Sequence, residues 1–204
     1  MKSTAILKLV TPCVLACLPL SWLLAKPQDP KQPPPDQMAE MMRQAQRWTA
    51  PGEPHRVLER FLGKWNTELR MFIGGKASQP EKGTAESTWL MDGRWLTTRG
   101  RGSMMGMPLE QYLLIGYDNF KKSYVATAVS SMDTAMLRFE GDLTQDGKTL
   151  IAYGTLDEYL TGEHDKMVKC IWRFLADDKF LFEVHDLPIG ETDTKVFEIL
   201  YTKA

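Results

Sequence analysis

The sequence predicts an all-β protein, an antiparallel up-and-down barrel of about ten strands preceded by two short helices. Three observations support this fold class. Near Gly63 the spacing of apolar residues changes from the 3.6-residue period of a helix to the two-residue period of a strand. Ten β-rich runs follow, separated by turn pairs such as Asp92-Gly93 and Asp146-Gly147. No segment after Leu62 is long enough for a crossover helix, so the strands must pair antiparallel.

Size and composition exclude several classes of protein. The 204 residues fit one domain with short extras. The chain carries 25 Lys and Arg against 26 Asp and Glu, a net charge of -1, whereas nucleic-acid-binding domains are usually strongly basic. Hydrophobic residues make up 43% and charged residues 25%, as in globular proteins. We therefore expect no nucleic-acid partner, and three cysteines are too few for a disulfide scaffold.

Residues 1–25 are predicted to be a secretory signal peptide. Lys2 and Lys8 precede an uncharged apolar run that ends at the small residue Ala25. We expect cleavage after Ala25 and export to the periplasm or the extracellular space. Two alternatives stay open. The sequence VLAC, ending at Cys17, resembles the lipidation motif of bacterial lipoproteins, and an uncleaved run would form a membrane anchor. In either case the N-terminal segment is the only expected membrane contact.

A linker and two helices are predicted between the signal and the barrel. Residues 26–36 read KPQDPKQPPPD, and this proline content predicts an extended spacer. Two short helices are expected within residues 37–62, separated by Pro51-Gly52. The first has an apolar face of Met38, Met41, Met42, Ala45 and Trp48. Residues 63–204 are predicted to form the barrel domain.

The ten predicted strands occupy residues 65–71, 84–91, 95–102, 109–117, 123–130, 135–143, 149–157, 166–175, 180–187 and 194–202. Closing this sheet into a barrel removes the two edges that an open sheet would expose. A two-sheet sandwich is the competing architecture. A barrel of more than eight strands has room for an internal cavity, and the mouth of such a barrel is a common ligand site.

Alternation along the strands predicts which side chains face the interior. On four strands the inward residues are Trp65, Thr67, Leu69 and Met71; Leu137 and Phe139; Val168, Cys170, Trp172 and Phe174; and Phe180, Phe182 and Val184. The strands around Tyr112, Tyr124 and Glu198 do not alternate clearly enough to decide. A Glu198 that faced inward would need a partner, and Arg99 or Arg101 is the expected one.

Several sequence blocks resemble the DUF1579 family over about residues 55–203. The first block is His55-x-x-Leu58-x-x-Phe61-Leu62-Gly63-x-Trp65, and the second is the turn and strand from Asp92 to Leu96. Further similar blocks are Gly106–Glu110, Ile115–Asp118, Lys122–Val125 and Glu198-x-x-Tyr201-Thr202-Lys203, where the family pattern has Arg in place of Lys203. The element Gly63-Lys64-Trp65 is also similar to that of lipocalins and fatty-acid-binding proteins. The resemblance implies a lipocalin-like barrel and carries over no activity.

These observations favour an exported, non-enzymatic protein that binds a small, mostly apolar ligand inside its barrel. The sequence contains no Gly-x-Ser-x-Gly elbow and no histidine pair at metal-ligand spacing. We therefore expect no cofactor, and the sequence predicts no particular oligomeric state. The candidate ligand-binding residues are Trp65, Glu86, Arg99, Arg101, Tyr112, Tyr124, Trp172 and Glu198.

Three other functions stay open at this stage. An enzyme could use an acid–base site at the barrel mouth built from Glu198, Arg99 and Arg101, because a carboxylate facing an arginine in an apolar cavity has a shifted pKa. His185, on a strand, could be an axial haem ligand. The thioethers of Met104, Met105 and Met107 could bind Cu(I).

Overall fold

The computed structural model describes residues 33–158, 162–187 and 194–204. The chain divides into two units, Met1–Met42 and Arg43–Ala204. The predicted signal peptide (1–25), and with it Cys17, lies outside the described residues, as does the linker up to residue 32. The second unit contains all of the β-structure.

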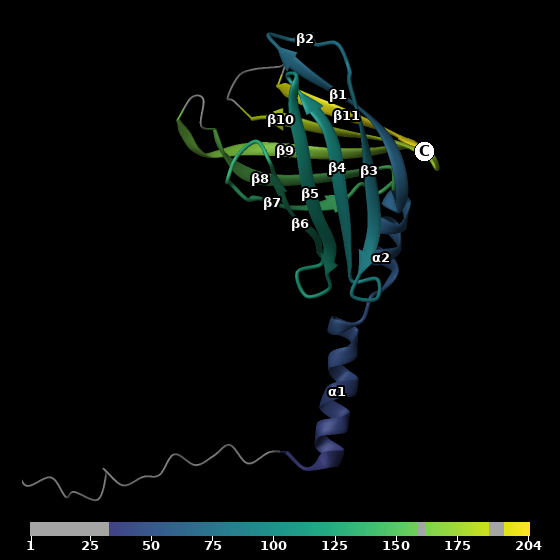
Figure 1. Ribbon diagram of the computed structural model, residues 1–204. Coiled ribbons are helices and arrows are strands. Elements are labelled where there is room, and N and C mark those ends of the chain that lie inside the picture. Colours follow the sequence, from purple (N-terminus) through teal and green to yellow (C-terminus); the bar gives the residue numbers. More distant parts are fainter. Residues whose placement is uncertain (1–32, 159–161, 188–193) are drawn as a thin grey trace, which may run out of the picture. The chain divides into compact units, whose positions relative to one another are not determined.

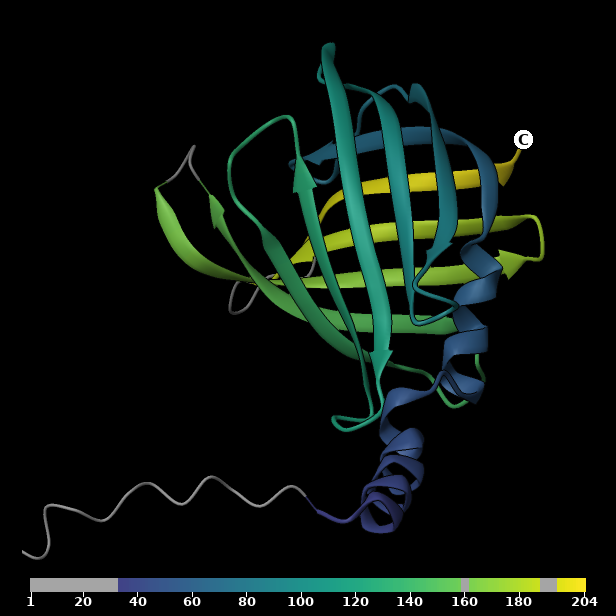
Figure 2. The ribbon, with the colours of Figure 1, turned by 60° about the horizontal axis from the view of Figure 1, so that its bottom comes forward.

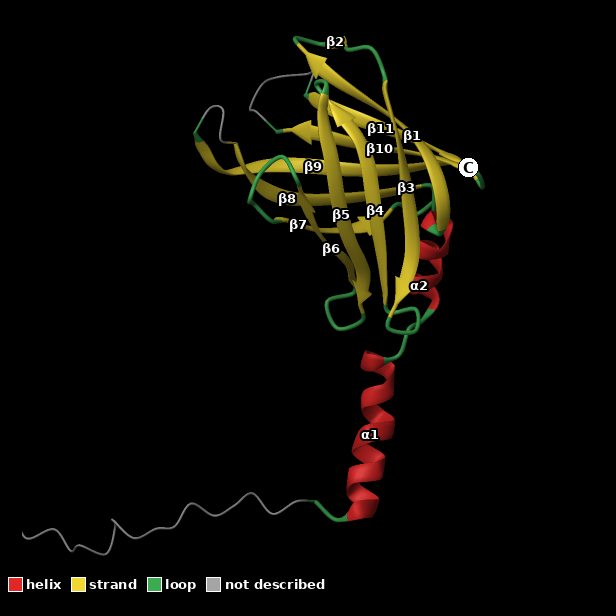
Figure 3. Cartoon of the chain, in the orientation of Figure 1, coloured by secondary structure: helices red, strands yellow, loops and turns green. Residues whose placement is uncertain are grey.

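Two helical segments precede the barrel (Figure 3). Helix α1 (Pro35–Thr49) buries none of its residues. After Pro51-Gly52, α2 (Glu53–Arg56) continues directly into a 3-10 helix, η2 (Val57–Phe61). Pro54 lies in the first turn of α2, where its missing N–H costs no hydrogen bond, and the N–H of Gly52 donates to Nδ1 of His55 at 3.1 Å. The two predicted helices are therefore present, the second being tighter than an α-helix.

In the described residues eleven strands follow, and ten of them form the wall of a barrel (Figure 1). They are β1 (Gly63–Ile73), β2 (Lys76–Ala77), β3 (Glu81–Leu90), β4 (Trp95–Met104), β5 (Met107–Asp118), β6 (Ser123–Ser130), β7 (Leu137–Leu143), β8 (Thr149–Glu158), β9 (Glu163–Ala176), β10 (Lys179–Asp186) and β11 (Lys195–Lys203). The two-residue β2 only extends the tip of β1.

The barrel is closed by the pairing of its first and last strands. Apart from β2, each strand pairs antiparallel with the next along the chain, and β1 pairs with β3 on one edge and β11 on the other. Trp65 lies opposite both Ala85 and Lys203, which joins the two ends of the sheet. Figure 2 shows the strands curling round into this continuous wall. The predicted ten-stranded barrel is confirmed, and a two-sheet sandwich is excluded because the sheet closes on itself.

The two ends of the barrel differ, and we call them the closed end and the open end. The closed end has the α2–η2 segment and the turns at 91–94, 119–122, 144–148 and 177–178. The open end has the connections β1–β3, β4–β5 and β6–β7, together with the end of β8, the start of β9, the end of β10 and the start of β11. This arrangement follows from strand direction, because β1 leaves η2 and successive strands alternate.

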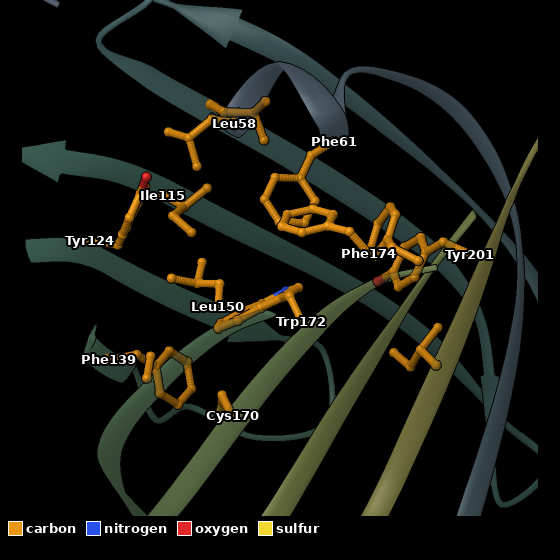
Figure 4. Packing of buried hydrophobic residues seen from close by; sticks show 14 of the residues in the cluster. Leu58, Phe61, Ile115, Tyr124, Phe139, Leu150, Cys170, Trp172, Phe174 and Tyr201 are labelled. Atoms are coloured by element: carbon orange, nitrogen blue, oxygen red, sulfur yellow. The ribbon is translucent and has the colours of Figure 1, made fainter. Parts of the chain in front are cut away.

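An aromatic core fills the closed half (Figure 4). The ring of Phe61, on η2, packs against Phe174 at 5.0 Å and Phe180 at 5.1 Å between centroids. Trp65 is 1% exposed, and its Nε1 donates to the carbonyl oxygen of Phe61 at 2.8 Å. Tyr201 stacks on Phe180 at 4.2 Å. These contacts make η2 a plug whose side chains belong to the barrel core.

Polar contacts fix the helical segment to the closed end. Oη of Tyr124 donates to the carbonyl of Pro54 at 2.9 Å. Nη1 of Arg60 donates to the carbonyl of Gly147 at 2.8 Å, and its guanidinium lies 3.7 Å from the centre of the Phe174 ring. The α2–η2 segment is thereby held to β6, to β9 and to the turn at 144–148, which lie far from it in the sequence.

The predicted inward residues do face the interior. Trp65 and Leu69 on β1, Phe139 on β7, the four residues Val168, Cys170, Trp172 and Phe174 on β9, and Phe180 and Val184 on β10 are all buried. Thr67, Met71, Leu137 and Phe182 share their rows but are only half-buried.

Candidate ligand-binding site

The open half of the barrel is lined by apolar side chains that face inward and still contact solvent. They come from seven strands and are Met71, Leu109, Leu113, Ala128, Leu137, Leu156, Phe182 and Phe197. Their cross-strand partners show that they share one face, since Leu113 pairs with Ala128 and Ala128 pairs with Leu137. In the closed half, by contrast, Leu58, Leu96 and Leu150 are 0% exposed. The interior is therefore packed at one end and accessible to solvent at the other.

A small cavity opens in the wall of this region, where β1, β3, β4 and β5 lie side by side. Its volume is about 20 Å³, enough for one water molecule. Thr67, Gly83, Gly100 and Gln111 are among its lining residues. Thr67 pairs with Gly83, and Gly100 pairs with Gln111. Gly100 lets the Gln111 side chain lie against the β4 backbone, because a Cβ on Gly100 would lie 2.9 Å from Cγ of Gln111.

Glu81 lies at the edge of the cavity and is held as a carboxylate. Ser103 Oγ donates to its Oε2 at 2.5 Å, and the backbone N–H of Met105 and of Gly106 donate at 2.7 and 3.1 Å. These hydrogen bonds, that of Ser103 first, lower the pKa of Glu81. The cavity therefore has a negative charge at its edge.

A charged pair, Lys166 and Asp186, lies in the inward row on the wall opposite the cavity. Lys166 pairs with Leu156, and its Nζ lies 2.9 Å from Oδ2 of Asp186. The hydrogen bond to Asp186 is the main reason that the pKa of Lys166 is raised. The lysine is thus already neutralised by its own neighbour.

Three of the predicted site residues lie inside the barrel. Trp65 and Tyr124 belong to the packed closed half, and Trp172 stacks on Phe182 at 4.8 Å. Burial, followed by the charges of Tyr117 and Asp142, raises the pKa of Tyr124 to about 12, so its hydroxyl stays protonated. Trp172 is 3% exposed, and its contact with Phe182 places it directly next to the lining of the open half.

Four others have side chains on the outer face of the barrel. Glu86 pairs with Arg99, Arg99 pairs with Tyr112, and Arg101 pairs with Glu110, so all of these side chains share the outward row. Glu110 accepts from Nε of Arg99 at 2.6 Å and from Oη of Tyr112 at 3.3 Å. Hydrogen bonding from Arg99 is the main cause of the lowered pKa of Glu110. The residues form a surface ion-pair cluster and not a mouth site.

Glu198 also faces outward, which corrects the expected pairing with Arg99 or Arg101. Its partners are Arg70 at 3.5 Å and Lys195 at 2.9 Å. Lys195 also contacts Glu183, which is 4% exposed and accepts from Nε of Arg173 at 2.6 Å. Burial by itself would raise the pKa of Glu183, but the hydrogen bonds and charges of Lys195 and Arg173 lower it overall. The proposed acid–base residues are thus split between two outer clusters.

The haem and copper alternatives rested on His185 and on three methionines. His185 follows the inward Val184 and lies beside Glu183 and Thr194, with Nδ1 3.2 Å from Oγ1 of Thr194. Its Nε2 is buried without a hydrogen bond, and burial is the main cause of its lowered pKa. Met105 and Met107 are 63% and 48% exposed. In the described part of the chain, no three His, Cys, Asp or Glu residues are grouped to hold a metal ion.

Sequence reasoning did not identify Glu81, Gln111 or Phe197 as lining residues. A usable signal was present in the alternation of Arg99-Gly100-Arg101-Gly102. Arginine prefers solvent, while glycine permits close approach of strands at the concave face of a strongly bent sheet. The glycine face is therefore the inward face, and pairing then carries Gln111 inward with Gly100.

Among the described residues, no helix has the length and apolar character needed to cross a bilayer. Cys170 is a buried free thiol, and burial raises its pKa.

Comparison with known proteins assigns the family. Two solved structures with similar folds are redesigned β-barrels. One, b11L5F_LGL, is 11% identical, has a TM-score of 0.37, and matches 73% of this chain and 96% of that chain. The other, mFAP1 bound to DFHBI, is 13% identical, has a TM-score of 0.39, and matches 72% and 99%. No curated protein matches the chain. The family model described as "Protein of unknown function (DUF1579)" matches residues 50–203, so the chain belongs to the DUF1579 family.

Proposed function

We propose that this protein binds a small, mostly apolar ligand in the open half of its barrel. One observation carries the proposal: inward-facing apolar side chains of seven strands remain half-exposed at one end, above a fully packed core at the other. Folding normally removes such surface from water, at about 25 cal/mol per Å². A ligand that covers Leu113, Leu137, Phe182 and their neighbours recovers the hydrophobic free energy that folding left unused.

The site combines rigid and adaptable parts. The floor is formed by Val168, Cys170 and Trp172, which are 0–3% exposed and fixed by the surrounding strands. Met71 lines the side, and its flexible thioether chain can adapt to ligands of different shape. These features favour binding over catalysis, because the ionisable groups described above that face this region are engaged by neighbours: Lys166 with Asp186, and Glu81 with Ser103.

Export belongs to the same proposal and rests on the sequence of residues 1–25. N-terminal sequencing of the protein recovered from periplasm or medium gives Lys26 as the first residue if ordinary cleavage occurs. A mass increase from a diacylglyceryl group on a chain that begins at Cys17 identifies the lipidated alternative. Recovery of the intact N-terminus in the membrane fraction identifies a retained anchor.

Ligand binding is tested with an environment-sensitive naphthylamine dye and a matched pair of variants on β6. Ala128 faces the interior between Leu113 and Leu137, whereas its neighbour Val129 faces outward and is 39% exposed. Ala128→Arg places a long charged chain in the open half and is expected to abolish the dye enhancement. Val129→Arg is expected to leave it unchanged.

Circular dichroism of both variants shows whether the barrel is retained. If Ala128→Arg fails to fold, Ala128→Leu tests the same position by filling space without adding charge, and a weaker dye signal is expected. Absence of dye uptake by the unmodified protein contradicts the proposal, and so does equal binding by the two arginine variants. Native mass spectrometry of protein purified without denaturation then identifies any retained ligand.

A further inference from the structure

The two walls of the open half differ in polarity, and this difference restricts the ligand. The wall of β7, β8, β10 and β11 presents Leu137, Leu156, Phe182 and Phe197. The opposite wall contains the cavity of about 20 Å³, with the hydroxyl of Thr67 and the amide of Gln111 on its lining. The Lys166–Asp186 ion pair on β9 and β10 is the charged exception on the first wall, and the second wall also carries apolar side chains such as Met71 and Leu109. A ligand that fills the open half therefore meets mainly apolar groups, with the hydrogen-bonding groups of the cavity on one side only.

The two polar side chains have hydrogen-bonding capacity to spare. Within the described residues, neither the Thr67 hydroxyl nor the Gln111 amide is bonded to another protein group. Glycine is required at position 83 of this lining, because a Cβ there would lie 2.5 Å from the backbone carbonyl oxygen of Arg101 and 2.8 Å from Oγ1 of Thr67. A Cβ on Gly100 would lie 3.0 Å from Nε2 of Gln111. The cavity therefore suits one compact polar group, the size of a water molecule.

The charge around the cavity selects the kind of polar group. Glu81, at its edge, is ionised at neutral pH because Ser103 and two backbone N–H groups donate to it. Arg101 contributes to the lining, but its guanidinium is directed to Glu110 on the outer face. Lys82 also contributes to the lining, but it belongs to the outward row, since it pairs with Glu68. An anionic group that entered from the interior would thus meet the carboxylate of Glu81.

We infer that the ligand is an uncharged amphiphile, an apolar body with one compact hydroxyl or amide group, and that Thr67 and Gln111 bind this group. The inference rests on the proposed ligand binding and adds the class of ligand. The polar group replaces water in the glycine-lined cavity, accepts from and donates to Thr67 and Gln111, and lets the body cover the apolar wall. Fatty acids are disfavoured because their carboxylate approaches Glu81.

The test compares dodecan-1-ol, dodecanoate and 1-fluorododecane as competitors of the naphthylamine dye. Dodecan-1-ol is expected to compete more strongly than dodecanoate. Thr67→Val removes a hydroxyl with little change of shape, and Gln111→Met removes the amide. Each variant is expected to lower the affinity for dodecan-1-ol by about 2- to 10-fold, as the loss of one hydrogen bond does. The affinity for 1-fluorododecane is expected to stay unchanged.

Two further variants control the experiment. Thr97→Val makes the same chemical change on the outer row of β4, where Thr97 pairs with Thr88, and is expected to change no affinity. Gly100→Ala adds a methyl group against the flexible Gln111 side chain and reduces the space in the cavity. It is expected to lower the affinity for dodecan-1-ol as well.

The outcomes separate the two claims. If the dye binds but all three competitors displace it equally from the unmodified protein, the inference about the ligand is overturned and ligand binding stands. The same conclusion follows if Thr67→Val and Gln111→Met leave the affinity for dodecan-1-ol unchanged. If the unmodified protein takes up neither the dye nor any competitor, ligand binding itself is refuted, and the inference with it.

Discussion

Replacing Trp65 by alanine removes the largest of the fully buried side chains in the closed half of the barrel. The indole is 1% exposed, and its ring contacts Phe180 at 4.8 Å and Tyr201 at 6.5 Å. Truncation of such a side chain costs about 3–5 kcal/mol. The change also leaves the carbonyl of Phe61 without the Nε1 donor at 2.8 Å, which adds about 1 kcal/mol.

The expected loss in the free energy of unfolding is therefore about 4–6 kcal/mol. For a domain of this size, each kcal/mol lowers Tm by about 2–4 °C. Urea denaturation followed by circular dichroism measures the change. Trp65→Phe keeps most of the apolar contact and loses the hydrogen bond, so we expect about 1–2 kcal/mol for it.

Tyr153→Ala provides the control, because this aromatic side chain lies on the outer face and is 49% exposed. Its effect is expected to stay within about 0.5 kcal/mol. A loss of less than about 1 kcal/mol for Trp65→Ala would refute the reasoning. It would mean that η2 and the aromatic core of the closed half do not stabilise the barrel as a packed unit.

Three further predictions follow from single contacts. Glu183→Gln weakens the ion pairs with Arg173 and Lys195 and is expected to cost about 2 kcal/mol at neutral pH. Because the folded-state pKa of Glu183 is lowered, the stability it contributes is present above the unfolded value near 4.3 and is lost on acidification below it. The free energy of unfolding, measured from pH 7 to pH 3, should therefore fall less for the variant than for the unmodified protein. Tyr124→Phe loses the hydrogen bond to Pro54 and should cost about 1 kcal/mol with dye binding unchanged; altered dye binding would contradict its place in the packed half. The Cys170 thiol, buried and with a raised pKa, should react with Ellman's reagent only in urea, and a fast reaction in buffer would show that the floor of the open half is exposed.

The strands and their pairing order were predictable because local patterns determine them. Asp92-Gly93 and Asp146-Gly147 mark hairpins, and each strand between such turns pairs with the next along the chain. On β9 the alternation of Val168, Cys170 and Trp172 with charged residues identified the inward face correctly. These features require only the period of the chain and the chemistry of its turns.

The candidate site was predictable only in part. Glu198 lies between apolar neighbours on both rows of β11, Phe197 and Ile199 on one and Val196 and Leu200 on the other, so alternation did not decide its face. A shift of one residue in register moves every side chain of a strand to the other face. The pairing of Arg70 on β1 with Glu198 on β11, at opposite ends of the barrel sequence, determines that Glu198 faces outward.

The sequence by itself determined that this chain folds as an antiparallel barrel, because the two-residue period, the hairpin turns and the lack of a crossover helix are local properties. It also determined the apolar character of the interior. Only the tertiary structure decided that η2 fills one end and leaves the other half accessible, since plugging depends on contacts such as that of Phe61 with Phe174. Likewise, Thr67 and Gln111 line one cavity only because β1, β3, β4 and β5 are neighbours in a curved sheet, with glycines of β3 and β4 between the two side chains.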